Sequence, residues 1–245
     1  MTSQAQSGQP AVFHVTHWKA GSQWVRGVLT EAQAHRIVPL KNDMSHVTVD
    51  PTVEEGIYTP VYLGRHRFET VIDPALDKRV FVIIRDLRDT LISWYFSLKV
   101  SHGVGVGNVA AFREQLNALN FEEGLKYLIC GNLVGIAKIQ TSWITSTEPI
   151  IRYEDMLADE QGVYKKIFSH CGFAFSDSDR EKIVQKHSFE QKSGRKRGQE
   201  DIKSHYRKAM VGDWKNHFSD PIKDLFKERF GQVLIDTGYE SNFDW

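Results

Sequence analysis

The apolar run VFVII at residues 80–84 constrains the fold of this chain more than any other feature. It is continuous and made of β-branched and aromatic side chains. Such a run is typical of a central strand in a parallel sheet, where helices cover both faces. Runs at 12–16 and 149–153 predict two further strands, and each of the three is followed by apolar residues at helical spacing. Helices are expected at 121–145 and 154–171, whereas the pattern between 39 and 75 is irregular and interrupted by prolines. Strands that alternate with helices predict an α/β fold with a central, mainly parallel β-sheet flanked by helices.

The length and charge of the chain limit the functions that it can have. A chain of 245 residues fits one large α/β domain better than two small ones. We therefore expect a flexible N-terminal tail at 1–10 and a single domain at 11–245. Lys plus Arg and Asp plus Glu both number 31, so the formal net charge of zero gives no support for general binding to nucleic acid or to membranes.

Cysteine usage and hydropathy indicate the compartment. The two cysteines, Cys130 and Cys171, lack metal-ligand spacing and are too few for a disulfide framework. The polar start of the chain has no signal-peptide pattern, and no apolar run reaches the length of about 18 residues that a membrane span needs. We expect a cytoplasmic protein.

The first candidate site is the loop THWKAGSQWV at 16–25, which joins the first predicted strand to a helical pattern at 22–35. Backbone N–H groups near Gly21, at the N-terminus of that helix, can bind an anion. Lys19 precedes the glycine, whereas the common nucleotide-binding P-loop has its lysine after the last glycine. The alternative is a tight turn with a solvated lysine.

The second candidate site follows the strongest predicted strand. Arg85 ends that strand, and Ser93 comes eight positions later, about two turns into a helix that Asp86 or Asp89 can cap. Ligands of parallel sheets bind beyond the C-terminal strand ends, and an arginine there can hold a phosphate with two hydrogen bonds. The alternative is that Arg85 pairs with one of the two aspartates and that Ser93 faces solvent.

The third candidate site is RKAMVGDWKNHF at 207–218. The adjacent Arg207 and Lys208, directly before a Gly-Asp-Trp turn, can clamp a second phosphate. The stretch 192–208 is polar, basic and interrupted by glycine, which predicts a mobile surface loop. A nucleic-acid contact at this loop is the weakest alternative, because the whole chain is neutral.

Together these motifs resemble those of the cytosolic-type sulfotransferases that use 3′-phosphoadenosine 5′-phosphosulfate (PAPS). The resemblance rests on five landmarks in the family's order: HWKAGSQW at 17–24 for the family's Y-P-K-S-G-T-T-W, Arg85 with Ser93, Tyr-Glu-Asp at 153–155, Ser-Phe at 188–189, and 207–218 for R-K-G-x-x-G-D-W-K-N-x-F. They cover about residues 13–230. An early lysine then suits a leaving 5′-phosphosulfate rather than a nucleoside triphosphate.

The resemblance implies a P-loop-like sulfotransferase fold and an enzyme that moves the sulfuryl group of PAPS to a hydroxyl of a small-molecule alcohol or phenol, releasing 3′,5′-adenosine bisphosphate (PAP). No metal is implied. The cofactor-binding residues implied are Lys19, Ala20, Gly21, Ser22, Gln23, Trp24, Arg85, Ser93, Tyr153, Ser188, Phe189, Arg207, Lys208 and Ala209.

These residues divide into roles by the same resemblance. Lys19 neutralises the leaving 5′-phosphate, and Ser93 joins it among the catalytic residues while contacting the 3′-phosphate. The 3′-phosphate is also held by Arg85, Arg207, Lys208 and the N–H of Ala209. Trp24 and Phe189 stack on the adenine, with Tyr153 at its edge.

The general base is assigned by counting. Family members often use a histidine about 22 residues before the strand-end arginine. Counting back from Arg85 reaches 62–64, and the nearest histidine is His66, although the family's K-T-H pattern is absent. A histidine suits proton removal near neutral pH. His46 and His17 remain alternatives.

The sequence departs from the family pattern at several positions. Ala20 replaces a serine, Gln23 a threonine, and Ala209 the glycine after Arg-Lys, where close backbone approach to the 3′-phosphate is then tighter. The family's dimerisation signature maps onto 215–224, where Asp220 replaces a buried valine, so we expect a monomer or a weak homodimer.

The acceptor pocket and two rival functions stay open. The segments 38–70 and 101–110 are expected to line the pocket because they lie between the motifs. One rival is a non-catalytic protein that binds PAPS or PAP. The other is a P-loop nucleotide kinase, which the missing Gly-Lys-Ser/Thr magnesium ligand opposes.

Overall fold

The computed structural model of the chain describes residues 8–39, 54–103, 105 and 108–245. The tail expected at 1–10 falls mostly outside the described residues, and so does His46, one of the candidate bases.

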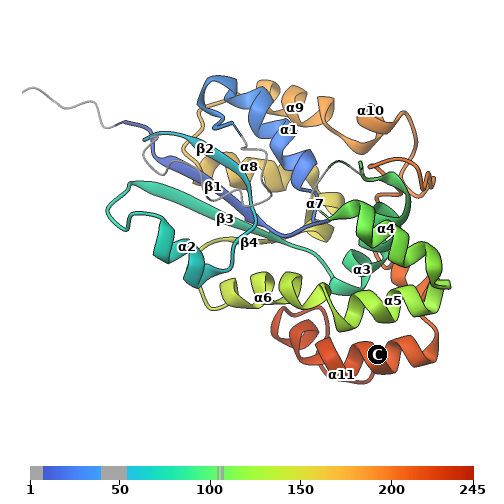
Figure 1. Cartoon of the computed structure of the whole chain (residues 1–245). Coiled ribbons are helices and arrows are strands. Elements are labelled where there is room, and N and C mark those ends of the chain that lie inside the picture. The colour runs from blue at the N-terminus through green and yellow to red at the C-terminus, as the bar shows by residue number, and fades with distance from the viewer. Residues whose placement is uncertain (1–7, 40–53, 104, 106–107) are drawn as a thin grey trace, which may run out of the picture.

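A four-stranded, entirely parallel sheet lies at the centre of the molecule (Figure 1). Its strands follow the order β2 (Ile57–Val61), β1 (Ala11–Thr16), β3 (Lys78–Ile84) and β4 (Ile150–Arg152). The two middle strands pair from Ala11 opposite Lys78 to Thr16 opposite Ile83. Because these strands are covered on both faces, their sequences are continuously apolar rather than alternating. The predicted α/β fold with a central parallel sheet is confirmed.

Alternate residues of the middle strands pack on opposite faces of the sheet, as the strand period of two requires. Val12, Phe81 and Ile83 pack on the face covered by α1 (Ser22–Ala32), α8 (Glu160–His170) and α9 (Asp177–Lys186). Phe13 and Val82 pack on the other face, which is covered by α2 (Arg65–Val71) and α6 (Leu133–Trp143).

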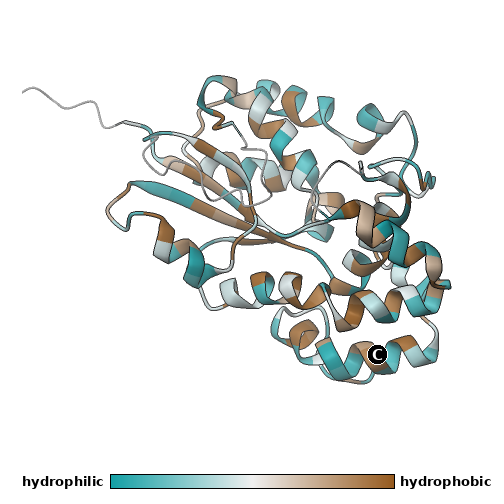
Figure 2. Ribbon diagram, in the orientation of Figure 1, coloured by the Kyte–Doolittle hydropathy of each residue, from teal (hydrophilic) through white to brown (hydrophobic). Residues whose placement is uncertain are grey.

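A second apolar core lies beyond the C-terminal ends of the strands. It joins α3 (Leu87–Phe96), α4 (Val109–Ala118), α5 (Phe121–Cys130) and α11 (Asp220–Asp236). Figure 2 shows the hydrophobic residues of these helices on the sides that face one another. The short elements α7 (Tyr153–Ala158), α10 (Phe189–Ser193), η1 (Ala34–Arg36), η2 (Ser97–Ser101) and η3 (Asp213–Asn216) complete the described chain.

Three expectations about the elements are wrong in detail. The region 39–75, expected to be irregular because of its prolines, contains β2 and α2; Pro60 is tolerated in β2 because this strand is at the sheet edge. The helix expected at 121–145 is divided at Gly131 into α5 and α6. The helix expected at 154–171 is divided at Asp159, whose carboxylate accepts the N–H of Gly162 and begins α8.

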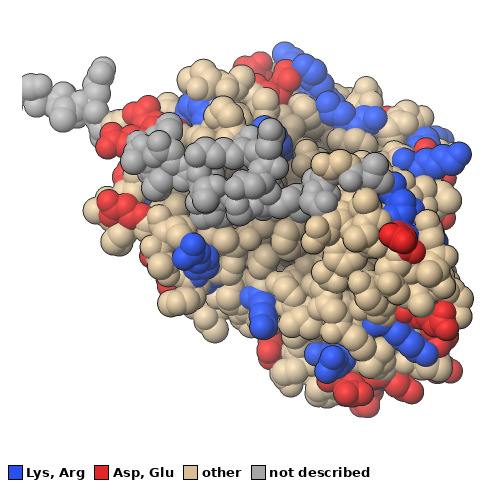
Figure 3. Space-filling view, viewed as in Figure 1, with Lys and Arg blue, Asp and Glu red and all other residues tan. Residues whose placement is uncertain are grey.

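The surface carries both signs of charge. On the face drawn in Figure 3, Lys and Arg are interspersed with Asp and Glu rather than gathered in a patch of one sign. No helix among the described residues is long and apolar enough to cross a membrane.

Candidate active site

The loop between β1 and α1 is held in an unusual backbone conformation. Lys19 has φ 70 and Gly21 has φ 82, both in the left-handed region. A non-glycine residue there costs about 1–2 kcal/mol, so the rest of the structure must impose it. At Gly21 a Cβ would lie 3.0 Å from the ring of Tyr153, which explains why this position has no side chain. Strain of this kind is often found at binding loops.

His17 connects this loop to the end of β3. Its Nδ1 donates to the carbonyl of Trp18 (2.9 Å), and its Nε2 accepts the backbone N–H of Arg85 (3.2 Å) and the amide of Gln140 (2.6 Å). Burial, assisted by the charge of Arg85, lowers the pKa of His17 to about 4. The ring is therefore neutral at pH 7 and has both nitrogens engaged, which excludes it as the general base.

Lys19 extends from the loop into a cavity. Its Nζ donates to the hydroxyl of Ser97 (3.1 Å), which lies on the π-helical turn η2 at the end of α3. Turns of this kind often occur at functional sites. Burial, together with the charges of Arg85 and Arg207, lowers the pKa of Lys19 to about 7.

Arg85 lies beneath the same loop and is only 7% exposed. Its Nη1 donates to the carbonyl of Lys19 (2.9 Å), and its guanidinium carbon lies 4.4 Å from the centre of the Tyr153 ring. Its Nε has no hydrogen-bond partner in the described chain. Burial opposes the charge, but Tyr153 and nearby carboxylates outweigh it and raise the pKa of Arg85.

The aspartates next to Arg85 have other partners, so the alternative pairing considered from the sequence does not form. Asp86 caps α3, as expected, by accepting the N–H of Arg88, and it also pairs with the Arg88 guanidinium (2.7 Å). Asp89 accepts the N–H groups of Gly212 (2.7 Å) and Trp214 (2.9 Å). It thereby fixes the Gly-Asp-Trp turn to α3.

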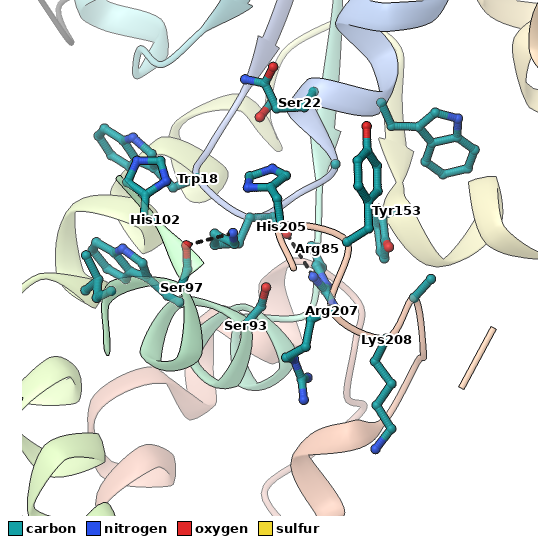
Figure 4. A pocket seen from close by; sticks show the side chains of 18 of the residues that line it. Trp18, Ser22, Arg85, Ser93, Ser97, His102, Tyr153, His205, Arg207 and Lys208 are labelled. Carbon is teal, nitrogen blue, oxygen red and sulfur yellow. Dashed lines mark hydrogen bonds between the residues drawn. The ribbon is translucent and has the colours of Figure 1, made fainter. Parts of the chain in front are cut away.

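The basic pair Arg207 and Lys208 shares the carboxylate of Asp213, which is 1% exposed, and Arg207 also pairs with Glu200. Arg207 Nη2 and Lys208 Nζ each lie 2.6 Å from one of its carboxylate oxygens. Burial alone would raise the pKa of Asp213, but hydrogen bonds from His217, Lys208 and Arg207 lower it well below its usual range. In Figure 4 both basic side chains extend away from His205 and Ser93.

The segment that leads to this pair is bound by one guanidinium. Arg195 donates to the carbonyls of Gln199 (2.6 Å) and Arg207 (3.0 Å) and also to that of Tyr206, and it lies 5.4 Å from the Phe189 ring centre. The segment has no helix or strand between 194 and 212, but these hydrogen bonds hold its backbone together. It ends at Ala209, whose φ of 47 is again left-handed.

These side chains line one cavity of about 680 Å³. The residues predicted from the sequence that line it are Lys19, Gly21, Ser22, Gln23, Trp24, Arg85, Ser93, Tyr153, Phe189, Arg207, Lys208 and Ala209. Figure 4 shows Ser93 between Ser97 and Arg207, and Tyr153 on the other side of the cavity from Trp18.

Three predicted residues do not line the cavity. Ala20 is buried in the core beneath α1. Ser188 begins α10 by accepting the N–H of Gln191 (3.3 Å). His66 is exposed on α2 and does not line the cavity, whereas Tyr62, which the count back from Arg85 also reaches, does line it. His66 is therefore not placed to act as a base on a hydroxyl in the cavity.

Sequence reasoning missed most of the opposite cavity wall, which is aromatic. Trp18 stacks on Tyr62 (ring centroids 4.9 Å apart) and is parallel to Trp94 (6.4 Å). The segments 38–70 and 101–110, expected to line the acceptor pocket, contribute Tyr62, His102, Asn108 and Val109. Further lining residues that were missed are Ser97, Leu98, Phe112, His205, Tyr206 and Met210. The available signal was adjacency: Trp18 precedes Lys19 and Trp94 follows Ser93 directly.

In the described part of the chain, no group of three or more His, Cys, Asp or Glu side chains could hold a metal ion.

Comparison with known proteins identifies the class. The fold is that of mouse sulfotransferase SULT7A1 complexed with PAP, with a TM-score of 0.69 at 19% identity over 94% of this chain and 89% of that chain. Retinol dehydratase complexed with androsterone and PAP is also similar, with a TM-score of 0.56 at 16% identity over 91% and 80%. These likenesses show a sulfotransferase fold.

The family follows from sequence. The family model for the sulfotransferase domain matches residues 66–238. Flavonol 3-sulfotransferase of Flaveria bidentis is 24% identical over 93% of this chain and 82% of the relative. The 3-alpha-hydroxysteroid sulfotransferase of Cavia porcellus is 24% identical over 94% and 85%. The chain belongs to the sulfotransferase family and is a sulfotransferase, which confirms the predicted family, fold and enzyme class.

Proposed function

We propose that this sulfotransferase transfers the sulfuryl group of PAPS to the hydroxyl of a small, apolar, aromatic acceptor and releases PAP. One observation carries the proposal: Lys19 and Arg85 lie in the same cavity, and neither forms an ion pair within the described residues. Two buried or half-buried cations that have only neutral partners favour an anionic ligand.

The start of α1 supports a phosphate-binding role for the loop. The N-cap of this helix, Gly21, provides no side-chain cap, and the helix has no acidic residue in its first turn. The first N–H groups of a helix have no intrahelical partner and carry a partial positive charge. The N–H groups of Ser22 to Trp24 would therefore bind the 5′-phosphate together with the ammonium of Lys19.

The 3′-phosphate would be held at the end of β3. The unpartnered Nε of Arg85 is a free donor, and Ser93 offers a hydroxyl from the next helix. Arg207 and Lys208 line the same cavity, but Asp213 already takes one hydrogen bond from each. They would contribute through the loop backbone at Ala209 more than through free charge.

The adenine would lie between aromatic side chains at one end of the cavity. Trp24 and Phe189 are 9% and 7% exposed, and the Trp24 ring meets Tyr153 edge to face at 6.3 Å. Stacking on a base contributes about 1–3 kcal/mol for each aromatic side chain. This end also holds Leu157 and His187.

The acceptor would occupy the other end. Its wall is formed by Trp18, Tyr62, Trp94, Leu98 and Phe112. Parallel and stacked rings favour a flat apolar molecule. Bound PAPS supplies the sulfuryl group, and Lys19 would stabilise the negative charge that develops on the leaving oxygen.

Titration with PAP followed by transfer assays tests the proposal. We expect calorimetry to give 1:1 binding of PAP, and ³⁵S-labelled PAPS to label 4-nitrophenol or 2-naphthol in the presence of EDTA. PAP binding without labelling of any hydroxyl in an acceptor library would favour the non-catalytic alternative. A reaction that EDTA abolishes would favour the nucleotide kinase. Failure to bind PAP would reject the proposal itself.

A further inference from the structure

Sulfuryl transfer to a hydroxyl needs a proton acceptor in the cavity. The hydroxyl proton becomes acidic as the new oxygen–sulfur bond forms, and a side chain that accepts it accelerates the reaction by roughly 10²–10⁴-fold. His66 is exposed on α2, and His17 has both ring nitrogens engaged. Among the histidines that the structure describes, the base must therefore be sought outside the recognised motifs, an inference that rests on the proposed function.

Two histidines lie beside Lys19 in the cavity. His102 follows the π-helical turn η2, and His205 lies two residues before Arg207. The charge of Lys19 acts on both rings, and His205 also interacts with His102. In Figure 4, His205 lies between Ser97 and Tyr153, whereas His102 lies beside Trp18.

The nitrogens of His205 are available for proton transfer. Neither ring nitrogen forms a hydrogen bond with the residues that the structure describes, and the ring is exposed to the cavity. His187, the third cavity histidine, has its Nε2 3.8 Å from Glu31 and lies at the adenine end with Trp24 and Phe189. It is too far along the cavity to serve a hydroxyl bound near Lys19.

We propose that His205 is the general base of this sulfotransferase. The acceptor oxygen forms a bond to the sulfur of PAPS, and the bond between sulfur and the bridging oxygen breaks. The electron pair of that bond leaves on the 5′-phosphate of PAP, next to Lys19. The hydroxyl proton passes to a neutral nitrogen of His205 and from there to solvent.

The surroundings of His205 make its basicity depend on the donor. The groups that face it or its neighbours are Lys19, His102, Tyr206, Arg113, Arg85 and Arg207. Partial desolvation inside the cavity, then the positive charges of Lys19 and His102, lower the pKa of His205 to about 4. A bound nucleotide adds several negative charges beside the same cations, which favours protonated imidazole and raises its pKa. His205 thus becomes an effective base when the donor is present.

His205 is preferred to His102 because of the segment that carries it. Arg195 binds the carbonyls of both Tyr206 and Arg207, so it fixes His205 in the same segment as the basic pair. His102 is attached to a different element, the end of η2, which no hydrogen bond between described residues joins to the segment of the basic pair.

Matched variants separate the two histidines. We expect His205→Gln to reduce kcat for 2-naphthol by roughly 10²-fold, while the Kd for PAP changes less than about threefold. The loss should be smaller for 4-nitrophenol, whose more acidic hydroxyl needs less help from a base. His102→Gln should change kcat by less than about tenfold and to the same extent for both phenols. Equal losses for both phenols in His205→Gln, or the acidity dependence in His102→Gln, would overturn the assignment.

A second readout requires no turnover. The imidazole signals of the ten histidines can be followed by NMR across pH, with His205→Gln identifying the relevant signal. We expect saturation with PAP to raise the pKa of His205 by at least one unit, roughly the effect of a nearby opposite charge. PAP binding without that rise would reject His205 and leave the proposed function intact, whereas absent PAP binding would reject the proposed function first.

Discussion

The two basic regions of the cavity differ in what neutralises them. At the loop after β1, Lys19 and Arg85 have only a hydroxyl and a carbonyl as hydrogen-bond partners. At the Gly-Asp-Trp turn, Arg207 and Lys208 both bind the buried carboxylate of Asp213. A cation that forms no ion pair is more available to a ligand, whereas a paired buried charge mainly holds structure. Basic residues that all belong to cofactor-binding motifs therefore differ in how readily they can bind a ligand.

Removing the carboxylate at the paired region is expected to have the largest effect. Asp213→Asn removes the buried carboxylate that Arg207 and Lys208 share, which among the described residues leaves Lys208 without an ion pair and Arg207 with Glu200 alone. Breaking a buried ion pair in this way typically costs about 3–5 kcal/mol. Urea unfolding measures it. Asp220→Asn, a control in which an exposed aspartate pairs with Lys223, should change the free energy of unfolding by less than about 1 kcal/mol. If the free energy of unfolding changed by less than about 1 kcal/mol in both variants, the proposed difference between the paired and the unpaired region would be wrong.

At the unpaired region the expected effect is on catalysis. Lys19→Ala should reduce kcat by roughly 10²–10³-fold, as for other groups that stabilise a developing charge. The free energy of unfolding should change by about 1 kcal/mol or less, since Nζ has one neutral partner. Lys126→Ala, which removes an exposed pair with Glu122, should keep full activity. Near-normal turnover of Lys19→Ala would refute its assigned role.

The low pKa of Lys19 predicts proton uptake when PAP binds. With a pKa of about 7, roughly nine-tenths of the amine is neutral at pH 8. The phosphate raises this pKa, so the complex binds up to about one more proton than the free protein. Affinity should accordingly fall by up to about tenfold per pH unit above pH 7.

Calorimetry at pH 8 in buffers of different ionisation enthalpy measures this uptake. The phosphates of PAP are already ionised at that pH, because their second pKa is about 6. Lys19→Ala should bind PAP without the extra proton. The same uptake in that variant would assign it to another group.

The smallest expected effect concerns the backbone of the paired region. Ala209→Gly relieves a left-handed residue with φ 47. The gain, reduced by the greater flexibility of glycine in the unfolded chain, should be about 0.5 kcal/mol of added stability. Chemical denaturation with replicate curves measures it, and a loss of stability would show that the Ala209 methyl makes a contact of its own.

A strand of the sheet could be predicted where its own sequence was sufficient to indicate a strand. The runs at 12–16, 80–84 and 149–153 are apolar enough to specify strands without their neighbours, and all three belong to the sheet. β2 was missed because Pro60 normally interrupts a strand, and only its place at the sheet edge makes it acceptable.

The residues of the candidate site also divide into those that a local motif predicts and those that only the folded chain brings together. Lys19, Arg85 and Arg207 were predicted from local motifs and line one cavity. Tyr62 lies in a segment that was expected to line the acceptor pocket, but its stacking on Trp18 was not predictable, because the two rings come from separate segments that meet only in the folded chain. Asp213 was seen as part of a turn, but its pairing with both basic residues depends on the loop conformation.

Gln140 positions two of the motif loops relative to each other, although it is not part of any motif. This residue of α6, on the opposite face of the sheet from α1, donates to His17 Nε2 (2.6 Å) and to the carbonyl of Arg85 (2.5 Å). Its amide thereby sets the spacing between two motif loops, although it belongs to neither. Grafting those loops onto another α/β scaffold would transfer the charges without their register, unless a helix supplying an equivalent amide were transplanted with them.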